Sequence, residues 1–263
     1  MLPILYNEKN YVIAVKPRGV LSQSASEATG KVPDMVEMLS EQLHSEIFPV
    51  HRLDRETAGV IVYAKNKRAA AAFSTLVAQN ALDKRYLAAV MGTPEPPAGE
   101  MRDLLYHDAR KNKSYVVSRK RAGVKQAILD YETLENAEYK AENESVPISV
   151  VRVHLHTGRT HQIRVQFSAR KMPLLGDTRY GCRIKVPELC LFAESLAFRD
   201  PFSGEERCFS AKPDGFLSLD KSVVAVSASI LRISSVFVIL SRRFSFFNPL
   251  NCLYSFADFS AHV

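Results

Sequence analysis

The sequence PVHRLDRETAGVIVYAKN, residues 49–66, joins a polar turn to a run of apolar residues. The run VIVYAK, residues 60–65, lacks the alternation of polar and apolar residues, which is typical of a strand buried on both faces. Arg52 and Asp54 precede this run and stand two positions apart. Residues i and i+2 of an extended segment point to the same side, so these two side chains could share a face and form an ion pair.

The segments around this stretch predict two more strands and a helix. Residues 11–15, YVIAV, predict a short buried strand that leads into a turn at residues 17–19. Asn66 is placed to cap a helix over residues 67–80, where alanines and an apolar stripe indicate an amphipathic helix. Residues 84–92, KRYLAAVMG, predict the next strand.

Residues 150–160, VVRVHLHTGRT, alternate between apolar and polar side chains. This alternation predicts a half-buried strand. Its inner side carries Val151, Val153 and Leu155, and its outer side carries Arg152, His154 and His156.

A helix is expected just after the turn at Gly158, with Thr160 as its N-cap. Ile163 and Phe167 lie one turn apart, so they would form its buried stripe. Arg164 would then leave the helix beside this stripe rather than within it.

The order of predicted elements indicates an α+β fold, because strands and helices do not alternate regularly and no internal repeat is present. We expect one folded domain over residues 1–219. Residues 220–263 are rich in serine and phenylalanine and are expected to lie outside its core. The apolar run at residues 222–240 approaches the length of a membrane span, but Arg232 and several serines argue against an anchor.

Composition and charge narrow the classes of function. The chain has 263 residues, of which 46% are hydrophobic and 24% charged, so it can bury a core. Its formal net charge of +7 favours an acidic partner, above all nucleic acid. The four cysteines show neither zinc-knuckle spacing nor a dense disulfide framework. Because no secretory signal opens the chain, we expect a cytoplasmic protein.

Three motifs of this sequence resemble those of the RluA-type family of RNA pseudouridine synthases. They are HRLDRETAGVIVYAKN at residues 51–66, KRYLAAVMG at residues 84–92 and LHTGRTHQIRVQFSARKMPLLGDTRYG at residues 155–181. Residues 4–23 and 189–205 are similar to the opening strand and the closing hairpin of the same family. The resemblance covers roughly residues 4–213.

The resemblance implies isomerisation of a uridine in ribosomal or transfer RNA, on a mixed and largely antiparallel sheet flanked by helices and loops. Asp54 matches the catalytic aspartate of the family. Its carboxylate could attack C1′ of the ribose or take the C2′ proton, and both routes require the ionised form. The resemblance implies no cofactor and no metal.

Four other residues receive roles from the same resemblance. Arg164 would keep Asp54 ionised and oriented, and Tyr86 would stack on the uracil. Ile163 would form part of the apolar wall of the pocket. Arg52 would fill the gap left when the uridine flips out of its stack.

Plainer interpretations exist for several of these residues. Arg52 and Asp54 could be a surface ion pair. His154, His156 and His161 invite a metal interpretation, but we predict no metal because the implied chemistry needs none. His51 is expected to be a hydrogen-bonded structural histidine. The basic run at residues 110–121 could be a solvated loop or could follow RNA phosphates.

Two other classes of function remain open at this point. A hydrolase could use Asp54 to release the base, but such enzymes usually pair two carboxylates, and we expect no second acid in the matched motifs, where Tyr86 and Arg164 stand instead. A non-catalytic RNA-binding or assembly factor would not need the matched residues. The sequence departs from the family at Ala58, where serine is common, and we expect no S4-type domain before the first strand. A monomer is the expected state, without a membrane partner.

Overall fold

The computed structural model describes residues 1–24, 34–141 and 145–213 and the strand at 223–225. In these residues one sheet runs through the molecule in the order β1-β2-β4-β10-β5-β9-β8-β6-β7, and three shorter strands join it at β4, β8 and β10. The strands are β1 Ile4–Asn7, β2 Tyr11–Lys16, β3 Phe48–Pro49, β4 Ala58–Ala64, β5 Asp83–Met91, β6 Ala98–Asp108, β7 Lys113–Val117, β8 Val124–Lys140, β9 Ser145–Leu155, β10 Leu191–Arg199, β11 Glu206–Ser210 and β12 Val223–Ala225.

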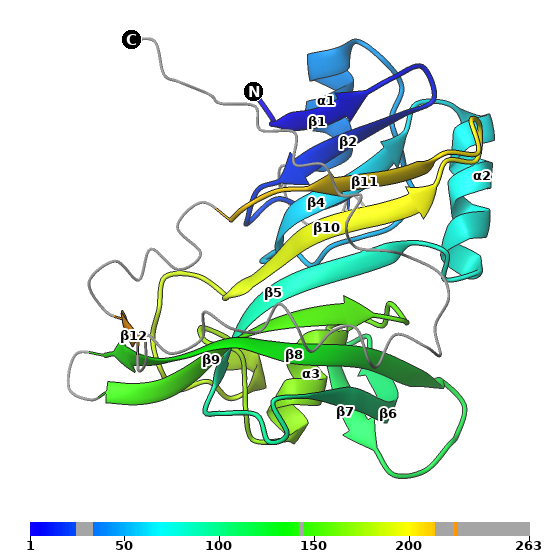
Figure 1. The fold of residues 1–263 in the computed structure, drawn as a ribbon. Coiled ribbons are helices and arrows are strands. Elements are labelled where there is room, and N and C mark those ends of the chain that lie inside the picture. Colours follow the sequence, from blue (N-terminus) through cyan, green and yellow to red (C-terminus); the bar gives the residue numbers. More distant parts are fainter. Residues whose placement is uncertain (25–33, 142–144, 214–222, 226–263) are drawn as a thin grey trace, which may run out of the picture.

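The helices are α1 Met35–Leu43, α2 Lys67–Ala78, α3 Gln162–Ala169 and the short 3-10 helix η1 Thr178–Tyr180. β4 and β10 pair in parallel, whereas the other strand pairings in the described residues are antiparallel. This confirms the predicted α+β fold with a mixed, largely antiparallel sheet. In Figure 1, β1, β2, β4 and β10 form the upper part and β6 to β9 the lower part, with β5 between them.

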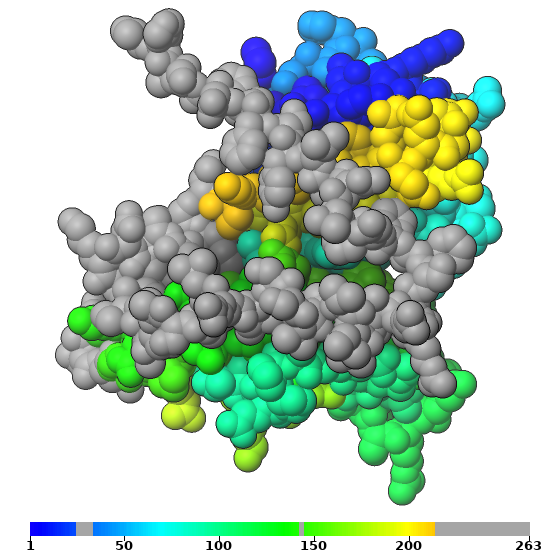
Figure 2. All heavy atoms as spheres, viewed as in Figure 1, coloured from blue at the N-terminus to red at the C-terminus, as the bar shows by residue number. Residues whose placement is uncertain are grey.

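The helices cover both faces of the sheet. α1 and α3 pack in one apolar cluster, which includes Val12 and Ile61. α2 packs in another cluster, which includes Ile13 and Val60. Because neighbouring residues of a strand point to opposite faces, α1 and α3 lie on one face and α2 lies on the other. In the same view, blue and yellow atoms gather in the upper part of the molecule and green atoms in the lower part (Figure 2).

Several predictions for the stretch around β4 are confirmed. All seven residues of β4 are buried, as the unbroken apolar run indicated. Asn66 caps α2, since its Oδ1 accepts a hydrogen bond from the N–H of Ala69 at 2.8 Å. Phe73 and Ala69 form the buried stripe of this helix. The alternation of β9 is confirmed as well.

Gly59 allows β4 to meet β10. Its φ angle is +124°, and an added Cβ would lie 2.3 Å from the carbonyl oxygen of Ala193, its partner on β10. No side chain fits there. The close approach fixes the turn before β4, which carries Asp54, against the middle of the sheet.

One sequence-based prediction is wrong. Thr160 is not the N-cap of α3, because His161 holds that position with a left-handed φ of 55°. Arg164 lies outside the apolar cluster of Ile163 and Phe167, as predicted, but it is buried, because residues 162–167 of α3 are all buried. The basic run is also not simply a loop, since residues 113–117 form β7 of a hairpin with β6.

The predicted boundary between domain and tail is not tested by these residues. β12, at 223–225, pairs with residues 137–139 of β8. The rest of the predicted tail lies outside the described residues. Within the described part of the chain, no helix is long and apolar enough to cross a membrane.

Candidate active site

Asp54 and Arg164 meet although 110 residues separate them in the sequence. Asp54 lies in the turn before β4, and Arg164 is the third residue of α3. The guanidinium Nη1 donates a hydrogen bond to Asp54 Oδ2 at 3.3 Å. The side chain of Asp54 is 26% exposed and that of Arg164 is 7% exposed. Arg164 therefore binds the carboxylate on one side, and another side of the carboxylate remains accessible.

Asp177 completes this arrangement, and its role was not predicted from the sequence. Arg164 donates from Nε and Nη2 to the two carboxylate oxygens of Asp177, at 2.7 and 2.9 Å. Asp177 is 1% exposed, so the guanidinium is clamped by a buried partner. Burial alone would lower the pKa of Arg164, but hydrogen bonds and charges from Asp177 and Asp54 outweigh it and raise the pKa. Arg164 is therefore a permanent cation with a fixed orientation.

The chain around Asp177 is shaped to place this carboxylate. Gly176 has a φ of +82°, and an added Cβ would lie 2.3 Å from the carbonyl oxygen of Glu188. Asp177 caps η1 by accepting a hydrogen bond from the N–H of Tyr180. The sequence signal was a glycine and an acid together in the third motif, GDTRYG, where the acid received no role.

Lys16 is a second residue whose role sequence reasoning missed. Its ammonium group is buried and donates hydrogen bonds to the carbonyl oxygens of Pro17, Val20 and Arg55, at 2.8, 2.7 and 3.1 Å. Burial lowers the pKa of Lys16 to about 8. Because Arg55 follows Asp54 directly, this lysine ties the opening turn to the backbone of the site.

Tyr86 and Ile163 are buried in the same apolar cluster, which also includes Phe167 of α3. Tyr86 is 7% exposed and Ile163 is 4% exposed. Burial, and then the charge of Asp54, raise the pKa of Tyr86 well above its ordinary value of 10.0. The phenol therefore stays neutral. The structure thus brings both residues into one apolar cluster, and Tyr86 lies close enough to Asp54 to be influenced by its charge.

Arg52 does not pair with Asp54. Its side chain is exposed and makes no hydrogen bond or ion pair with another described residue. The ion pair suggested by their spacing is wrong because Arg164, from a distant element, contacts the carboxylate instead. The predicted role of Arg52 in contacting RNA stays a prediction.

His51 is a structural residue, as predicted. Its Nε2 accepts a hydrogen bond from the N–H of Val62 at 3.4 Å. Burial, assisted by the charge of Lys84, lowers the pKa of His51 to about 3. A neutral imidazole is needed for this contact, because Nε2 must keep its lone pair.

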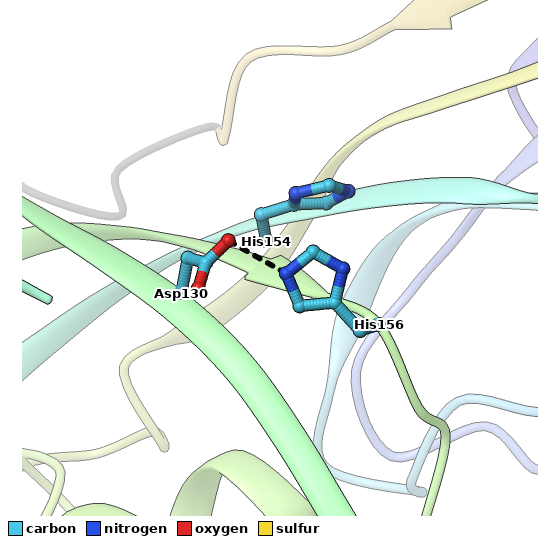
Figure 3. Close-up of side chains that lie close together, drawn as sticks. All are labelled: Asp130, His154 and His156. Atoms are coloured by element: carbon cyan, nitrogen blue, oxygen red, sulfur yellow. Dashed lines mark hydrogen bonds and ion pairs between the residues drawn. The ribbon is translucent and has the colours of Figure 1, made fainter. Parts of the chain in front are cut away.

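One group in the described residues could hold a metal ion, namely Asp130, His154 and His156, whose ligand atoms lie within 4.8 Å of one another. Figure 3 shows that these side chains are close together and that His156 bonds to Asp130, at 2.6 Å. His154 also contacts Asp83 at 3.5 Å. The donor atoms thus have protein partners already, and the predicted absence of a metal stays a prediction.

This group lies on the other face of the sheet from Tyr86. Arg85 is the cross-strand partner of His154, and Tyr86 is the partner of Val153. Directly opposite residues point to the same face, and consecutive residues point to opposite faces. The group is thus separated from Asp54 by the sheet itself.

Comparisons with known proteins agree on one family. The model of the RNA pseudouridylate synthase family matches residues 10–169. The dual-specificity RNA pseudouridine synthase RluA of Escherichia coli is 33% identical over 218 residues, 81% of this chain and 94% of the relative. The tRNA pseudouridine synthase C of Vibrio vulnificus is 28% identical over 226 residues, 81% of this chain and 91% of the relative.

An uncharacterized RNA pseudouridine synthase of Mycobacterium bovis is 31% identical over 217 residues, and the match covers 77% of this chain but 66% of that protein. Among solved structures, human RNA pseudouridylate synthase domain containing 1 superposes with a TM-score of 0.71 at 25% identity. It covers 88% of this chain and 91% of its own. Human RNA pseudouridylate synthase domain containing 4 gives a TM-score of 0.66 at 25% identity, with 82% and 90% covered.

Proposed function

Because the chain belongs to the RNA pseudouridylate synthase family, and within it to the RluA type, we propose that it isomerises specific uridines in ribosomal or transfer RNA with Asp54 as the catalytic carboxylate. The relatives named above are RNA pseudouridine synthases, one described as dual-specificity and one as a tRNA enzyme. The reaction breaks the bond from N1 to C1′, turns the uracil and forms a bond from C5 to C1′.

The main support for this proposal is that Asp54 is bound by Arg164 on one side and accessible on another. Arg164 contacts one of its oxygens, while 26% of its side chain is exposed. The guanidinium of Arg164 orients the carboxylate by a charge-assisted hydrogen bond. The open side allows the carboxylate to reach the ribose, where it attacks C1′ or takes the C2′ proton.

Tyr86 and Ile163 supply the apolar wall for the detached base. The base must stay bound while it turns, and stacking on an aromatic ring provides such a hold. Since its pKa is raised by burial and by Asp54, Tyr86 enters the reaction as a neutral phenol. At the start of the reaction, Tyr86 therefore acts on the uracil by stacking of its ring and not as a charged phenolate.

Arg52 fits a role in base flipping. Its side chain is exposed close to Asp54 in the sequence and has no partner among the described residues. A planar cation can take the place of a flipped base between its neighbours in the stack.

A hydrolytic reaction is disfavoured by the state of the nearby second carboxylate. Asp177 is 1% exposed, and Arg164 occupies both of its oxygens. It is therefore not free to act as the acid that hydrolysis of a glycosidic bond usually requires.

The test is release of tritium from RNA labelled at C5 of uridine, with transfer RNA and ribosomal RNA offered separately. Wild-type protein is expected to release tritium from at least one pool, and Asp54→Ala is expected to be slower by at least about 1,000-fold. Asp130→Ala is the matched control, since Asp130 also has a basic partner but lies on the opposite face. Free uracil would indicate hydrolysis, and RNA binding without tritium release would indicate a binding factor.

A further inference from the structure

His161 faces Asp54 and has no part in the reaction described so far. Its Nε2 lies 3.8 Å from Asp54 Oδ2, and its side chain is 7% exposed. The residue begins α3 with a left-handed φ of 55°, a conformation that is uncommon for a residue with a bulky side chain. The backbone therefore turns this imidazole inward, toward the carboxylate.

The other ring nitrogen of His161 is held by a chain of hydrogen bonds from β7. The N–H of Ser114 donates to the hydroxyl oxygen of Tyr180 at 2.8 Å. That hydroxyl lies 2.9 Å from Nδ1 of His161. Ser114 is fixed in turn, because its own hydroxyl donates to the carbonyl oxygen of Thr160 at 2.6 Å.

This chain decides which nitrogen carries the proton. Tyr180 is buried, at 5% exposure, so its hydroxyl proton needs an acceptor. Nδ1 of His161 lies 2.9 Å from the hydroxyl and offers this acceptor. Nδ1 then uses its lone pair, and the single ring proton of a neutral histidine must lie on Nε2. Nε2 is the atom that faces Asp54.

We propose that His161 is a positioning residue for Asp54, whose neutral imidazole directs its Nε2–H at the carboxylate and so gives it a second donor besides Arg164. The inference rests on the proposed role of Asp54. A separation of 3.8 Å exceeds a hydrogen bond, but such contacts often tighten only when substrate is bound. Two donors, His161 and Arg164 at the start of α3, restrict the rotation of a carboxylate more than one can.

Burial favours the neutral ring of His161. Burial is the first cause that lowers the pKa of His161. The groups that face it are Asp54 from the turn before β4, Arg164 of α3, Asp177, Arg179 and Tyr180 around η1, and His107 of β6, whose ring centre is 6.5 Å away. The two arginines lower the pKa further, and the two aspartates raise it. A neutral ring donates to Asp54 without adding a second positive charge beside Arg164.

The decisive variant is His161→Asn. Asparagine tolerates left-handed backbone, and its amide oxygen can still accept from Tyr180, but it has no donor at the Nε2 position. We expect the single-turnover rate of pseudouridine formation to fall by about 10-fold to 100-fold, the scale of one hydrogen bond to a charged group, while the Kd for RNA changes by less than about 3-fold. The pH–rate profile should change as well, because the variant removes a donor that faces the carboxylate.

Two further variants separate this role from a structural one. His44→Asn is the matched control, since His44 is exposed and has a φ of 49°, and its rate should equal that of wild type. His161→Gln can place an amide N–H near the Nε2 position and should recover part of the lost rate. A wild-type rate and pH profile in His161→Asn would overturn the inference, as would a loss explained entirely by weaker RNA binding.

The tautomer can be measured without any activity. In protein labelled with ¹⁵N-histidine, the His161 signals, identified by their loss in His161→Asn, should show a protonated Nε2 and an unprotonated Nδ1 at neutral pH. Tyr180→Phe should relax this preference and slow the reaction. The opposite tautomer, or a charged ring, overturns the inference even if variants fail to fold. A wild-type protein inactive on both RNA pools would instead contradict the proposed function.

Discussion

Two groups of acidic and basic side chains lie on opposite faces of the central strands and differ in burial and in the elements that form them. The inner group is Asp54, Arg164 and Asp177, and the outer group is Asp130, His154 and His156 (Figure 3). In the inner group, the side chains of Arg164 and Asp177 are 7% and 1% exposed. In the outer group, those of His156 and Asp130 are 39% and 48% exposed.

The two groups also arise in different ways. The outer group comes from the neighbouring strands β8 and β9 and from the turn that follows, so local alternation is sufficient to form it. The inner group needs the turn before β4, the helix α3 and the residue that caps η1 to meet. An exposed ion pair contributes at most about 1 kcal/mol, whereas breaking a buried pair costs about 3–5 kcal/mol. Burial, rather than residue type, therefore distinguishes the two.

The largest difference is expected between Asp177→Asn and Asp130→Asn. Asp177→Asn leaves the buried guanidinium of Arg164 without its bidentate partner. We expect the free energy of unfolding to fall by about 3 kcal/mol and the rate of pseudouridine formation by about 100-fold, because Arg164 no longer orients Asp54. Chemical denaturation and single-turnover kinetics measure the two effects.

Asp130→Asn replaces a half-exposed carboxylate that bonds to His156. Its free energy of unfolding should change by less than about 1 kcal/mol, and its rate should not change. Equal effects of the two substitutions on stability and on rate would remove the distinction between the inner and outer groups.

A smaller difference is expected between Arg164→Lys and Arg152→Lys. Arg152 lies on the outer face and makes a bidentate contact with Glu194, at 2.8 and 2.9 Å, but it is 34% exposed. Lysine keeps the charge and loses the planar fork, so it cannot hold Asp177 at two points and also reach Asp54. We expect Arg164→Lys to slow the reaction by about 10-fold and Arg152→Lys to leave the rate unchanged.

The melting temperatures of Arg164→Lys and Arg152→Lys provide a second test of this difference. Arg164→Lys should lower the melting temperature more than Arg152→Lys does, since only the former lies among buried groups. If Arg152→Lys slowed the reaction as much as Arg164→Lys, the effect on the rate would not depend on whether the bidentate arginine lies in the inner group.

The parts of the molecule that follow from local rules were predicted from the sequence. The unbroken apolar run gave β4, the alternation gave β9, and Asn66 was recognised as the cap of α2. These features depend on neighbours in the chain. The ion pair between Arg52 and Asp54 was the plainer local alternative, and it does not form, because Arg164, 110 positions away, contacts the carboxylate instead.

What could not be predicted depends on contacts between distant segments. Nothing near Lys16 in the sequence shows that its ammonium will meet the carbonyl oxygen of Arg55. The burial of α3 on all sides, which places Arg164 in the interior, follows from the sheet on one side and the β6–β7 hairpin on another. The resemblance supplied Asp54 and Arg164, whereas Asp177 and His161 required the geometry.

The smallest expected effect concerns the outer group and its dependence on pH. Burial is the first cause that lowers the pKa of His154, and it outweighs the nearby charge of Asp83. The folded protein thus takes up this proton at a lower pH than the unfolded chain, whose histidines titrate near 6.5. As the pH falls below about 6.5, the unfolded state binds more protons, so the contribution of His154 to stability is lost until the folded group is protonated too.

His154→Asn removes this contribution, so its melting temperature should fall by about 2 °C less than that of wild type between pH 7 and pH 5. His44→Asn should follow wild type, since His44 is exposed. If the melting temperatures of wild type and His154→Asn depended equally on pH, the outer group would be too well solvated to affect stability at all. The difference between the two faces of the sheet would then be larger still.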